Sequence, residues 1–362
     1  MSAASSTSWL SQRVASGRFE RAAVHSAQLL GVGGFYVALL IFFSFQAHNF
    51  MTSQNTVNIL SNASVIAIVS IGQALVLISG GFDLSVSGTL PLGGIIYTEA
   101  ANKGHGVLLS TLLAVAAGLG VGLANGLIIT KIQINPLVTT LATLSITGGL
   151  AFTVSNGLTV TLNDVNDAPL GNNFARMPLW VWTTIALALV GFLLLRYTVF
   201  GRKLYALGGN REATRLAGLR TDALTTGVYM ISGALASFAG VVLVHQLLAG
   251  APTVGGDAAL KSIAAVILGG ASLSGGTGGI PGTLLGVMVL GTVSNGMALM
   301  QVPVFYQQIA TGGILLLAVG LARVRGLVEQ AVWSRPQHDE SRGTEQGAGR
   351  TASTTTYPEV SK

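Results

Sequence analysis

The 362-residue chain contains no cysteine, and only 9% of its residues are charged. The absence of cysteine excludes thiol catalysis, disulfide frameworks and metal sites with cysteine ligands. The chain also has no Gly-x4-Gly-Lys-Ser/Thr loop, no His-Glu-x2-His pair and no Gly-x-Ser-x-Gly turn, so the common ATP-binding, zinc-hydrolase and serine-hydrolase motifs are missing. We therefore expect no catalytic residue, no metal site and no cofactor bound by this chain itself.

Half of the residues are hydrophobic, and apolar stretches recur from residue 29 to residue 321 without a polar domain between them. A helix needs about 20 residues to cross a bilayer, so this pattern indicates an integral membrane protein. We count ten candidate segments: 29–46, 56–79, 86–101, 106–130, 137–155, 179–195, 224–249, 262–276, 280–299 and 306–322. The third and eighth are short and interrupted by glycine, so the pattern supports eight to ten spans.

The 19 basic residues are distributed unevenly between the loops. With a cytoplasmic N-terminus and ten spans, 16 of the 19 lie inside, and only Lys103, Arg176 and Lys261 lie outside. Short cytoplasmic loops carry an excess of Lys and Arg, so this partition supports both the orientation and the even number of spans. The net charge of +6 is then explained by contact with anionic lipid, and a nucleic-acid partner is unnecessary.

The sequence predicts three regions. Residues 1–28 are rich in Ser, Ala and Arg and form a cytoplasmic segment, followed by a retained first span rather than a cleaved signal peptide. Residues 29–325 form the transmembrane domain, and residues 326–362 form a polar, disordered cytoplasmic tail. Two connections are long: the outer one, 156–178, either faces a partner or is a solvated loop, and the inner one, 198–222, is basic and contains a short amphipathic stretch at 210–219.

Asp83 lies within "ISGGFDLS" (78–85) and is the one carboxylate deep in the apolar pattern. An unpaired charge at the bilayer centre costs about 2.5 to 3.5 kcal/mol on insertion scales, so the residue needs a partner or a function. One interpretation makes Asp83 a solute or gating residue at a break between helices. The favoured interpretation makes it the N-cap of a helix that begins near Leu84, with Gly80 and Gly81 allowing the preceding turn.

A second glycine-rich stretch, "ILGGASLSGGTGGIPGTLLG" (267–286), is too interrupted for a continuous helix. Either its backbone lines a cavity, or its small residues allow close packing against another helix. Residues 78–85 match residues 267–274 at five of eight positions, which indicates either an internal repeat or chance similarity in a glycine-rich chain. His245, the other candidate proton carrier, is interpreted as a packed or interface residue.

Four stretches together resemble the permease subunits of bacterial ABC importers for ribose, xylose, galactose and related monosaccharides. They are "GGFDLSVSG" (80–88), "GRKLYALGGNREATRLAGL" (201–219), "KSIAAVILGGASLSGGTGGIPGTLLG" (261–286) and "SNGMALMQVPVFYQQIATGGILLLAV" (294–319). The resemblance implies an all-α fold of about ten transmembrane helices, like that of the cobalamin importer, with both termini cytoplasmic. It also implies a homodimer in the bacterial inner membrane, an ATP-binding subunit that holds ATP and Mg, and an extracytoplasmic solute-binding protein.

Within the inner connection, "NREATRLAGL" resembles the family's segment that docks on the ATPase. The resemblance places Gly208, Asn210, Arg211, Glu212, Ala213, Arg215 and Gly218 in this coupling segment, as a short helix that follows a turn at 208–210; the alternative is a solvated loop. A neutral polyhydroxylated solute would suit a pathway with few charges. Candidate pathway or gating residues are Gly80, Gly81, Asp83, Ser85, Gln73, Asn125, Gly269, Gly270, Ser274 and Asn295, with Gln307 as a further polar candidate.

Two departures from the family pattern bear on the solute. Ala259-Leu260-Lys261 stands where the family usually has Glu-Leu-Asp, and Ser87 replaces a glycine. The resemblance therefore does not identify which sugar this chain would carry. A non-sugar solute, such as an autoinducer or a nucleoside, is the alternative within the family. The alternatives outside this family are a secondary carrier driven by an ion gradient, which would ordinarily need an intramembrane carboxylate network, and a membrane scaffold or receptor without transport.

Overall fold

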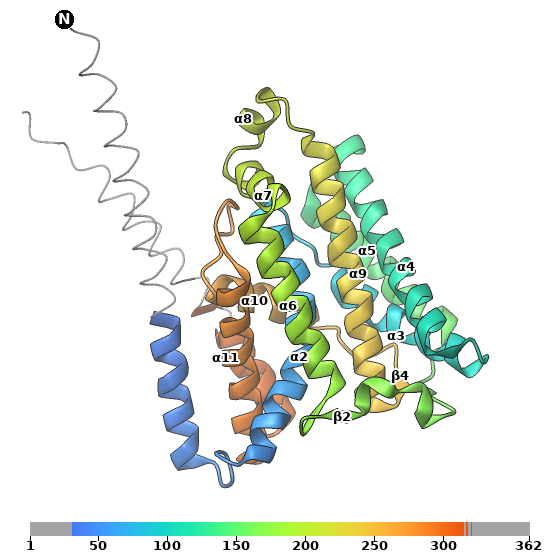
Figure 1. Cartoon of the computed structure of the whole chain (residues 1–362), viewed down its shortest axis with the longest axis vertical. Coiled ribbons are helices and arrows are strands. Elements are labelled where there is room, and N and C mark those ends of the chain that lie inside the picture. Colours follow the sequence, from blue (N-terminus) through green and yellow to red (C-terminus); the bar gives the residue numbers. More distant parts are fainter. Residues whose placement is uncertain (1–30, 315, 318–319, 321–362) are drawn as a thin grey trace, which may run out of the picture. The chain divides into compact units, whose positions relative to one another are not determined.

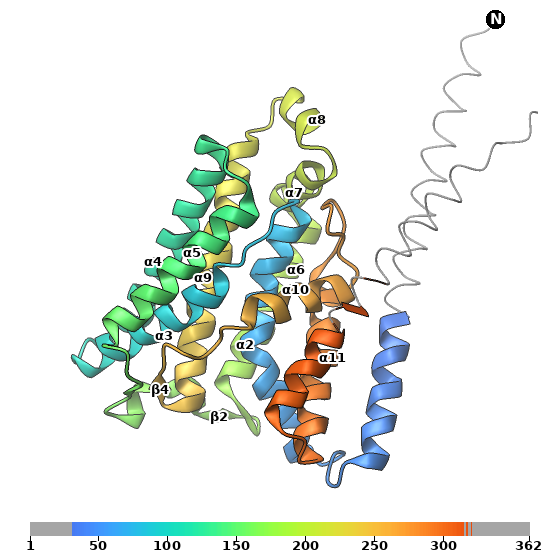
Figure 2. The ribbon, with the colours of Figure 1, turned by 180° about the vertical axis from the view of Figure 1, so that it is seen from behind.

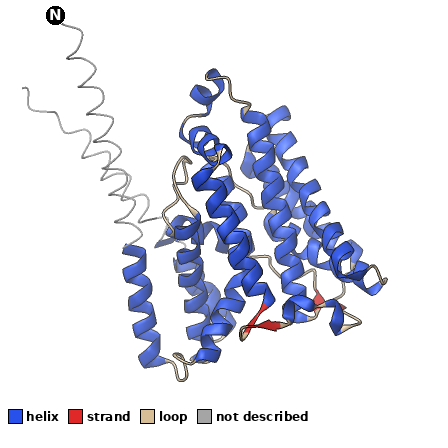
Figure 3. Ribbon diagram, in the orientation of Figure 1, coloured by secondary structure: helices blue, strands red, loops and turns tan. Residues whose placement is uncertain are grey.

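A computed structural model of the chain describes residues 31–314, 316–317 and 320. The described part is built almost entirely of helices (Figures 1 and 3). These are Gly31–Gln46, α2 (Ser53–Ile78), α3 (Val86–Asn102), α4 (Gly106–Leu127) with a π-helical turn η1 (Ile128–Ile132), α5 (Pro136–Val154), α6 (Leu179–Tyr197), α7 (Val199–Gly209), α8 (Arg211–Leu216), α9 (Thr221–Leu247), α10 (Ala258–Leu268), α11 (Ile280–Leu299) and a helix over 304–314.

Six helices of the described part are long and apolar enough to cross a membrane: α2, α4 continued through η1, α5, α6, α9 and α11. This confirms the prediction of a helical membrane protein, and each of the ten predicted segments overlaps a helix. The segment predicted over 262–276 is wrong at its C-terminal end, because α10 stops at Leu268 and residues 269–279 are irregular. The predicted terminal regions 1–28 and 326–362 lie outside the described residues.

Helix α2 forms the centre of the described bundle, with α6, α9, α10 and α11 packed around it (Figure 2). Of its most apolar 18-residue window, 78% is buried, against 22% for α4 and for α5 and 28% for α6. The outer helices expose large apolar side chains, such as Leu112, Ile146 and Leu189. In water such a surface would promote aggregation, whereas helices that face lipid are expected to expose apolar side chains.

Helices α4 and α9 approach closely along a row of glycines spaced four residues apart, Gly118, Gly122 and Gly126. A Cβ atom at Gly122 would lie 2.6 Å from the Cα atom of Met230, and one at Gly126 would lie 2.6 Å from the Cα atom of Thr226. Helices in lipid associate through such small residues because backbones can then approach closely. This row, hereafter the α4–α9 glycine seam, fixes the position of α9 against α4.

Two helices, α3 and α10, are each entered through irregular backbone. Residues 81–84 are irregular before α3, and residues 251–257 form turns before α10. Unpaired backbone at membrane depth is tolerated only when it is buried in protein or lines a cavity. Here Tyr229 donates its hydroxyl proton to the carbonyl oxygen of Phe82 at 3.0 Å, and Ser87 Oγ accepts the amide of Ala259 at 2.9 Å.

Helices α2 and α10 end in the same hydrogen-bonding pattern. At the end of α2, the amides of Gly80 and Gly81 bond to the carbonyls of Leu77 and Val76, and at the end of α10 the amides of Gly270 and Ala271 bond in the same way to Ile267 and Val266. Gly80 and Gly270 both have a positive φ, 82° and 95°, as is usual after a helix. Gly80 therefore corresponds to Gly270 and not to Gly269, so the predicted eight-residue match is out of register by one residue.

The loops divide into two groups at opposite ends of the long helices (Figure 1). Helices α7 and α8 lie at one end. At the other end, the outer connection forms two short antiparallel pairs: β1 (Val160–Thr161) with β4 (Ala249–Gly250), and β2 (Asn173–Phe174) with β3 (Met177–Pro178). The 3-10 turns Val165–Asp167 and Pro169–Gly171 lie between β1 and β2.

Candidate functional site

The inner connection forms two helices, α7 and α8, separated by one extended residue, Asn210. The predicted short helix after Asn210 is confirmed, and the Asn210 side chain caps it by accepting the amide of Ala213 at 2.9 Å. The prediction that Gly208 and Gly209 form a turn is wrong, because both residues belong to the last turn of α7. Gly218 follows α8 with φ of +81°, a conformation that glycine adopts without steric cost.

Helix α8 projects from the bundle with one buried anchor. The Thr214 hydroxyl donates within hydrogen-bonding distance of two carbonyls, those of Ala206 (2.9 Å) and Asn210 (2.7 Å). Its other side chains are exposed, including Leu216, which is 76% exposed.

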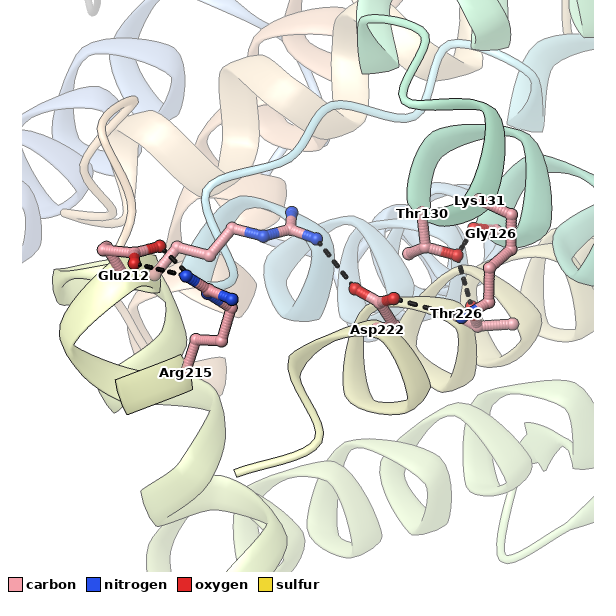
Figure 4. A network of polar contacts seen from close by, with 8 residues as sticks. Gly126, Thr130, Lys131, Glu212, Arg215, Asp222 and Thr226 are labelled. Carbon is pink, nitrogen blue, oxygen red and sulfur yellow. Dashed lines mark hydrogen bonds and ion pairs between the residues drawn. The ribbon is translucent and has the colours of Figure 1, made fainter. Parts of the chain in front are cut away.

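Glu212 and Arg215 form a pair on the exposed surface of α8 (Figure 4). Arg215 donates from Nε at 3.1 Å and from Nη2 at 2.7 Å to the two carboxylate oxygens. This hydrogen bonding lowers the pKa of the Glu212 carboxyl, so Glu212 is ionised at neutral pH. The surface of α8 therefore carries a fixed carboxylate and a fixed guanidinium.

A second ion cluster connects α8 to the ends of α4 and α9 (Figure 4). Asp222, in the first turn of α9, lies 3.1 Å from Lys131 Nζ in η1 and 3.5 Å from Arg211 Nη2 in α8. An acidic residue is favourable at a helix N-terminus. Exposed ion pairs contribute only about 0–1 kcal/mol, so this cluster orients the three segments more than it stabilises them. Asp222 and Lys131 were not predicted, because their proximity depends on how α4 and α9 pack.

The end of α7 contacts the ends of two other segments through glycines, which we call the glycine junction (Gly208, Gly275, Gly276 and Ile78–Gly80). The amide of Gly276 donates to the carbonyl oxygen of Ile78 at 2.9 Å, and a Cβ at Gly208 would lie 2.5 Å from the nitrogen of Gly276. Tyr205 of α7 donates to the carbonyl of Gly278 at 2.8 Å.

Several predicted pathway residues thus lie near the coupling segment. Gly80 and Ser274 approach each other in this region, since a Cβ at Gly80 would lie 3.8 Å from the carbonyl oxygen of Ser274 and 3.9 Å from the Cα of Gly208. Gly269 and Gly270 end α10, and a Cβ at Gly269 would lie 2.5 Å from the nitrogen of Thr283. At Gly269, the structure therefore supports close packing, one of the two explanations left open by the sequence.

Asp83 is fully buried and accepts three hydrogen bonds. Its Oδ1 atom accepts the amide (3.0 Å) and the hydroxyl (2.5 Å) of Ser85, and its Oδ2 atom accepts the hydroxyl of Ser232 on α9 at 2.7 Å. Helix α3 begins at Val86 with Ser85 as its N-cap, two residues later than the prediction for Asp83 requires, but Ser85 makes no side-chain cap bond. The predicted contact is present, because the Asp83 carboxylate accepts the amide of Ser85. Asp83 also joins the irregular backbone before α3 to the middle of α9.

The same network extends through Asn125 to α5. Asn125 of α4 donates from Nδ2 to Ser85 Oγ at 2.9 Å, and Thr143 of α5 donates to Asn125 Oδ1 at 2.6 Å. These side chains are almost fully enclosed. Gln73 is fully buried too, and within the described part of the chain neither atom of its amide has a hydrogen-bond partner.

The Asp83 network makes a prediction for stability. Replacing Asp83 with alanine leaves the hydroxyls of Ser85 and Ser232 without their acceptor, and an unsatisfied buried group costs about 1–3 kcal/mol. In a double-mutant cycle, Asp83→Ala and Ser232→Ala should couple by about 1 kcal/mol or more, measured as unfolding free energy in mixed micelles. Ser70→Ala is the control, because Ser70 Oγ is buried without a partner in the described part of the chain; additive effects of Asp83→Ala and Ser232→Ala would contradict the assignment.

Two of the predicted pathway candidates, Asn295 and Gln307, line a cavity. This cavity lies between α2, α11 and the helix over 304–314 and is also lined by Asn62 and Lys261. Asn295 donates from Nδ2 to Asn55 Oδ1 at 2.9 Å. The structure thus separates the predicted pathway residues: Gly80 and Ser274 lie near the glycine junction, Gly269 and Gly270 end α10, and Asn295 and Gln307 line this cavity. Asp83, Ser85 and Asn125 form one buried hydrogen-bond network, and Gln73 is buried outside it.

Comparison with known proteins identifies the family. Residues 55–319 match the model of the family described as branched-chain amino acid transport system / permease component. The chain belongs to this family of ABC transporter permeases. The L-arabinose ABC transporter permease AraH of Azospirillum brasilense is 37% identical over 296 residues, which cover 81% of this chain and 87% of that protein.

Two ribose permeases are also similar to the chain. The ribose import permease RbsC of Escherichia coli K12 is 36% identical over 288 residues, covering 78% of this chain and 90% of RbsC. RbsC of Bacillus subtilis is 34% identical over 295 residues, which cover 79% of this chain and 89% of that protein. This permease is therefore a transporter subunit and a multi-pass protein of the inner membrane, as the sequence predicted.

Proposed function

We propose that this permease translocates a monosaccharide as the membrane subunit of an ATP-driven importer. The proposal rests on the relatives named for import of ribose or L-arabinose, which match 78–81% of the chain. An importer permease is favoured over a secondary carrier, which would ordinarily need a network of carboxylates in the membrane. In the described part of the chain, the hydrogen-bond partners of Asp83 are the neutral amide and hydroxyl of Ser85 and the hydroxyl of Ser232.

The working assembly contains two copies of the permease, an ATP-binding subunit that holds ATP and Mg, and an extracytoplasmic solute-binding protein. The permease has ten spans, with both termini in the cytoplasm. The order of the described helices supports this topology, as does the position of basic residues: Lys131, Arg202, Lys203, Arg211 and Arg215 lie in the segments grouped with α7 and α8, whereas Arg176 lies at the other end beside β3 (Figure 1).

The coupling segment transmits the conformational change. ATP binding in the partner subunit displaces α8, which contacts that subunit through Arg211, Glu212, Ala213 and Arg215. The ion pairs of Asp222 with Lys131 and Arg211 couple the displacement of α8 to α4 and α9. The contacts of the glycine junction couple it to the end of α2 and to the loop before α11. A rigid-body shift of packed helices is an established way to exchange two states, and the ATPase selects between them by its different contacts with each.

The test is ATP-dependent uptake of radiolabelled pentoses and hexoses into proteoliposomes that contain the permease with its ATPase and binding protein. We expect saturable uptake of a monosaccharide by the native complex and at least a tenfold loss with Glu212→Arg, since reversing one interface charge places like charges together at a cost of several kcal/mol. Uptake driven by an ion gradient without ATP, or uptake of a nucleoside instead of any sugar, would contradict the proposed function.

A charge-swapped double variant distinguishes contact with the ATPase from stability of α8. Glu212→Arg with Arg215→Glu restores an intrahelical pair, which is worth about 0.2–0.5 kcal/mol, but it reverses the charges that the surface presents. We expect the double variant to stay inactive while its melting temperature matches that of the native permease. Recovery of uptake in the double variant would show that the pair only stabilises α8.

A further inference from the structure

Two adjoining cavities lie among α2, α10, α11 and the helix over 304–314. Their volumes are about 310 Å³ and 460 Å³, and both are lined by Lys261, Ser294, Gln307 and Thr311. Sites for small molecules have volumes of about 300–1,000 Å³, so each of the two cavities falls within this range. Neither contains the buried Asp83 network or the glycine junction among its lining residues.

The polar lining of the first cavity consists of amides, hydroxyls and one amine: Asn62, Lys261, Ser294, Asn295, Gln307 and Thr311. Aliphatic side chains of α2 and α11, such as Ile66 and Leu290, complete the wall of the first cavity. Amides and hydroxyls both donate and accept hydrogen bonds, which matches the hydroxyl groups of a sugar. The aliphatic wall matches the apolar face of a sugar ring.

Asn295 has an unused acceptor at the first cavity. Its Nδ2 atom is held by Asn55 Oδ1 at 2.9 Å, which fixes the orientation of the amide. Within the described part of the chain, its buried Oδ1 atom has no hydrogen-bond partner. Buried polar groups normally have partners, but this atom exposes less than 1 Å² of surface, so a bound solute reaches it only when the surrounding side chains move.

The charge in the lining is balanced. Lys261 Nζ lies 2.6 Å from Asp257 Oδ2 one turn earlier, and Asp257 lines the second cavity. The carboxylate also lies at the N-terminus of α10, where a negative charge is favourable. Because the pair has no net charge, the cavities favour a neutral solute over an anion or a cation.

The position of α10 agrees with a site part-way along the bundle. This short helix lies about midway along α2 (Figure 2), and it is entered through turns rather than through a continuous span. Transporters commonly bind their solutes near the middle of the membrane, at such interrupted helices. Ser294 and Asn295 of α11 and Gln307 of the following helix line the first cavity together with residues of α2.

We propose that these two cavities bind a neutral monosaccharide during translocation, with Asn62 and Lys261 as its polar contacts. This proposal rests on the proposed function. It adds the place in the bundle where the sugar binds and the side chains that donate and accept its hydrogen bonds. Lys261 is a specificity-determining residue here: paired with Asp257, it offers donors to ring hydroxyls without adding net charge.

The test compares Asn62→Leu with a matched control, Asn58→Leu. Both residues lie on α2 one turn apart and both are exposed, but Asn58 accepts a hydrogen bond from Gln54 at 3.3 Å and does not line either cavity. Uptake is measured in proteoliposomes that contain the complete transporter, with sugar-loaded binding protein at a saturating concentration. We expect Asn62→Leu and Lys261→Gln each to reduce this uptake about tenfold, because each variant loses one hydrogen bond to the sugar. Asn58→Leu should transport like the native permease.

ATP hydrolysis stimulated by the loaded binding protein is the second measurement. We expect it to stay within about twofold of native in Asn62→Leu and Lys261→Gln, because the coupling segment is unchanged, so that less sugar enters per ATP hydrolysed. Native-like uptake in both variants, with the native complex active, would overturn the cavity proposal alone. Absence of ATP-dependent sugar uptake by the native complex would overturn the proposed function itself.

Discussion

Replacing Gly122 with valine will separate α4 from α9 and destabilise the permease by about 3 kcal/mol or more, the upper part of the range for overpacked sites. A Cβ at this position would lie 2.6 Å from the Cα of Met230 and closer still to the carbonyl oxygen of Tyr229. Both obstacles are backbone atoms, which cannot move aside as the end of a flexible side chain does. The measurement is the melting temperature of the purified permease in detergent or nanodiscs.

Gly120→Val is the control for this prediction. Gly120 lies on the same helix, two residues from Gly122, and a Cβ there meets no described atom within 4 Å. The two variants make the same change to side-chain volume and helix propensity, so any difference reports the α4–α9 glycine seam. An equal loss of stability in both variants would mean that the seam does not limit how closely α4 and α9 approach.

The effect should extend to transport. Tyr229, Ser232 and Asp222 lie on α9, where they bond to Phe82, to Asp83 and to the ions around α8. A displaced α9 therefore disturbs both the irregular backbone before α3 and the coupling segment. We expect ATP-dependent uptake by Gly122→Val to fall more steeply than its melting temperature alone would explain.

The helices themselves could be predicted from the sequence, because apolar runs of sufficient length have one stable arrangement in a bilayer. Local signals also predicted α8, since Asn210 is a typical cap and Arg211–Leu216 contains good helix formers. The end of α10 was misplaced by eight residues: the predicted segment ran to 276, but residues 269–276 are mostly glycine and serine, and Gly269 and Gly270 end the helix.

The role of Asp83 could not be predicted, because it depends on a residue 149 positions away, Ser232. A short polar stretch after two glycines is compatible with a helix cap and with an irregular segment tied to another helix. The same limit applies to Asp222, which meets Lys131 only after α4 and α9 have packed. Contacts between distant segments decide these positions, and a single sequence contains no direct record of them.

Substituting alanine for Gly208 is expected to uncouple ATP hydrolysis from transport, because it enlarges the last turn of α7 at the glycine junction. A Cβ there would lie 2.5 Å from the nitrogen of Gly276 and nearer still to the carbonyl oxygen of Ile78, which accepts the amide of Gly276 at 2.9 Å. Overpacking of this kind costs about 1–3 kcal/mol and must move α7, α2 or the loop before α11. Uptake per ATP hydrolysed should therefore fall severalfold in the reconstituted transporter.

Gly209→Ala separates this effect from a general change in α7. Gly209 follows Gly208 in the same helical turn, and a Cβ there meets no described atom within 4 Å, so we expect native uptake and native ATP hydrolysis. Both substitutions replace helical glycine with alanine, which favours the helix by about 1 kcal/mol, and both leave the charged surface of α8 unchanged. A native rate of uptake and a native ratio of sugar to ATP in Gly208→Ala would contradict this prediction. The glycine junction would then be a packing contact that tolerates a larger side chain. The movement of α8 would have to reach the bundle through Asp222 and Lys131 alone.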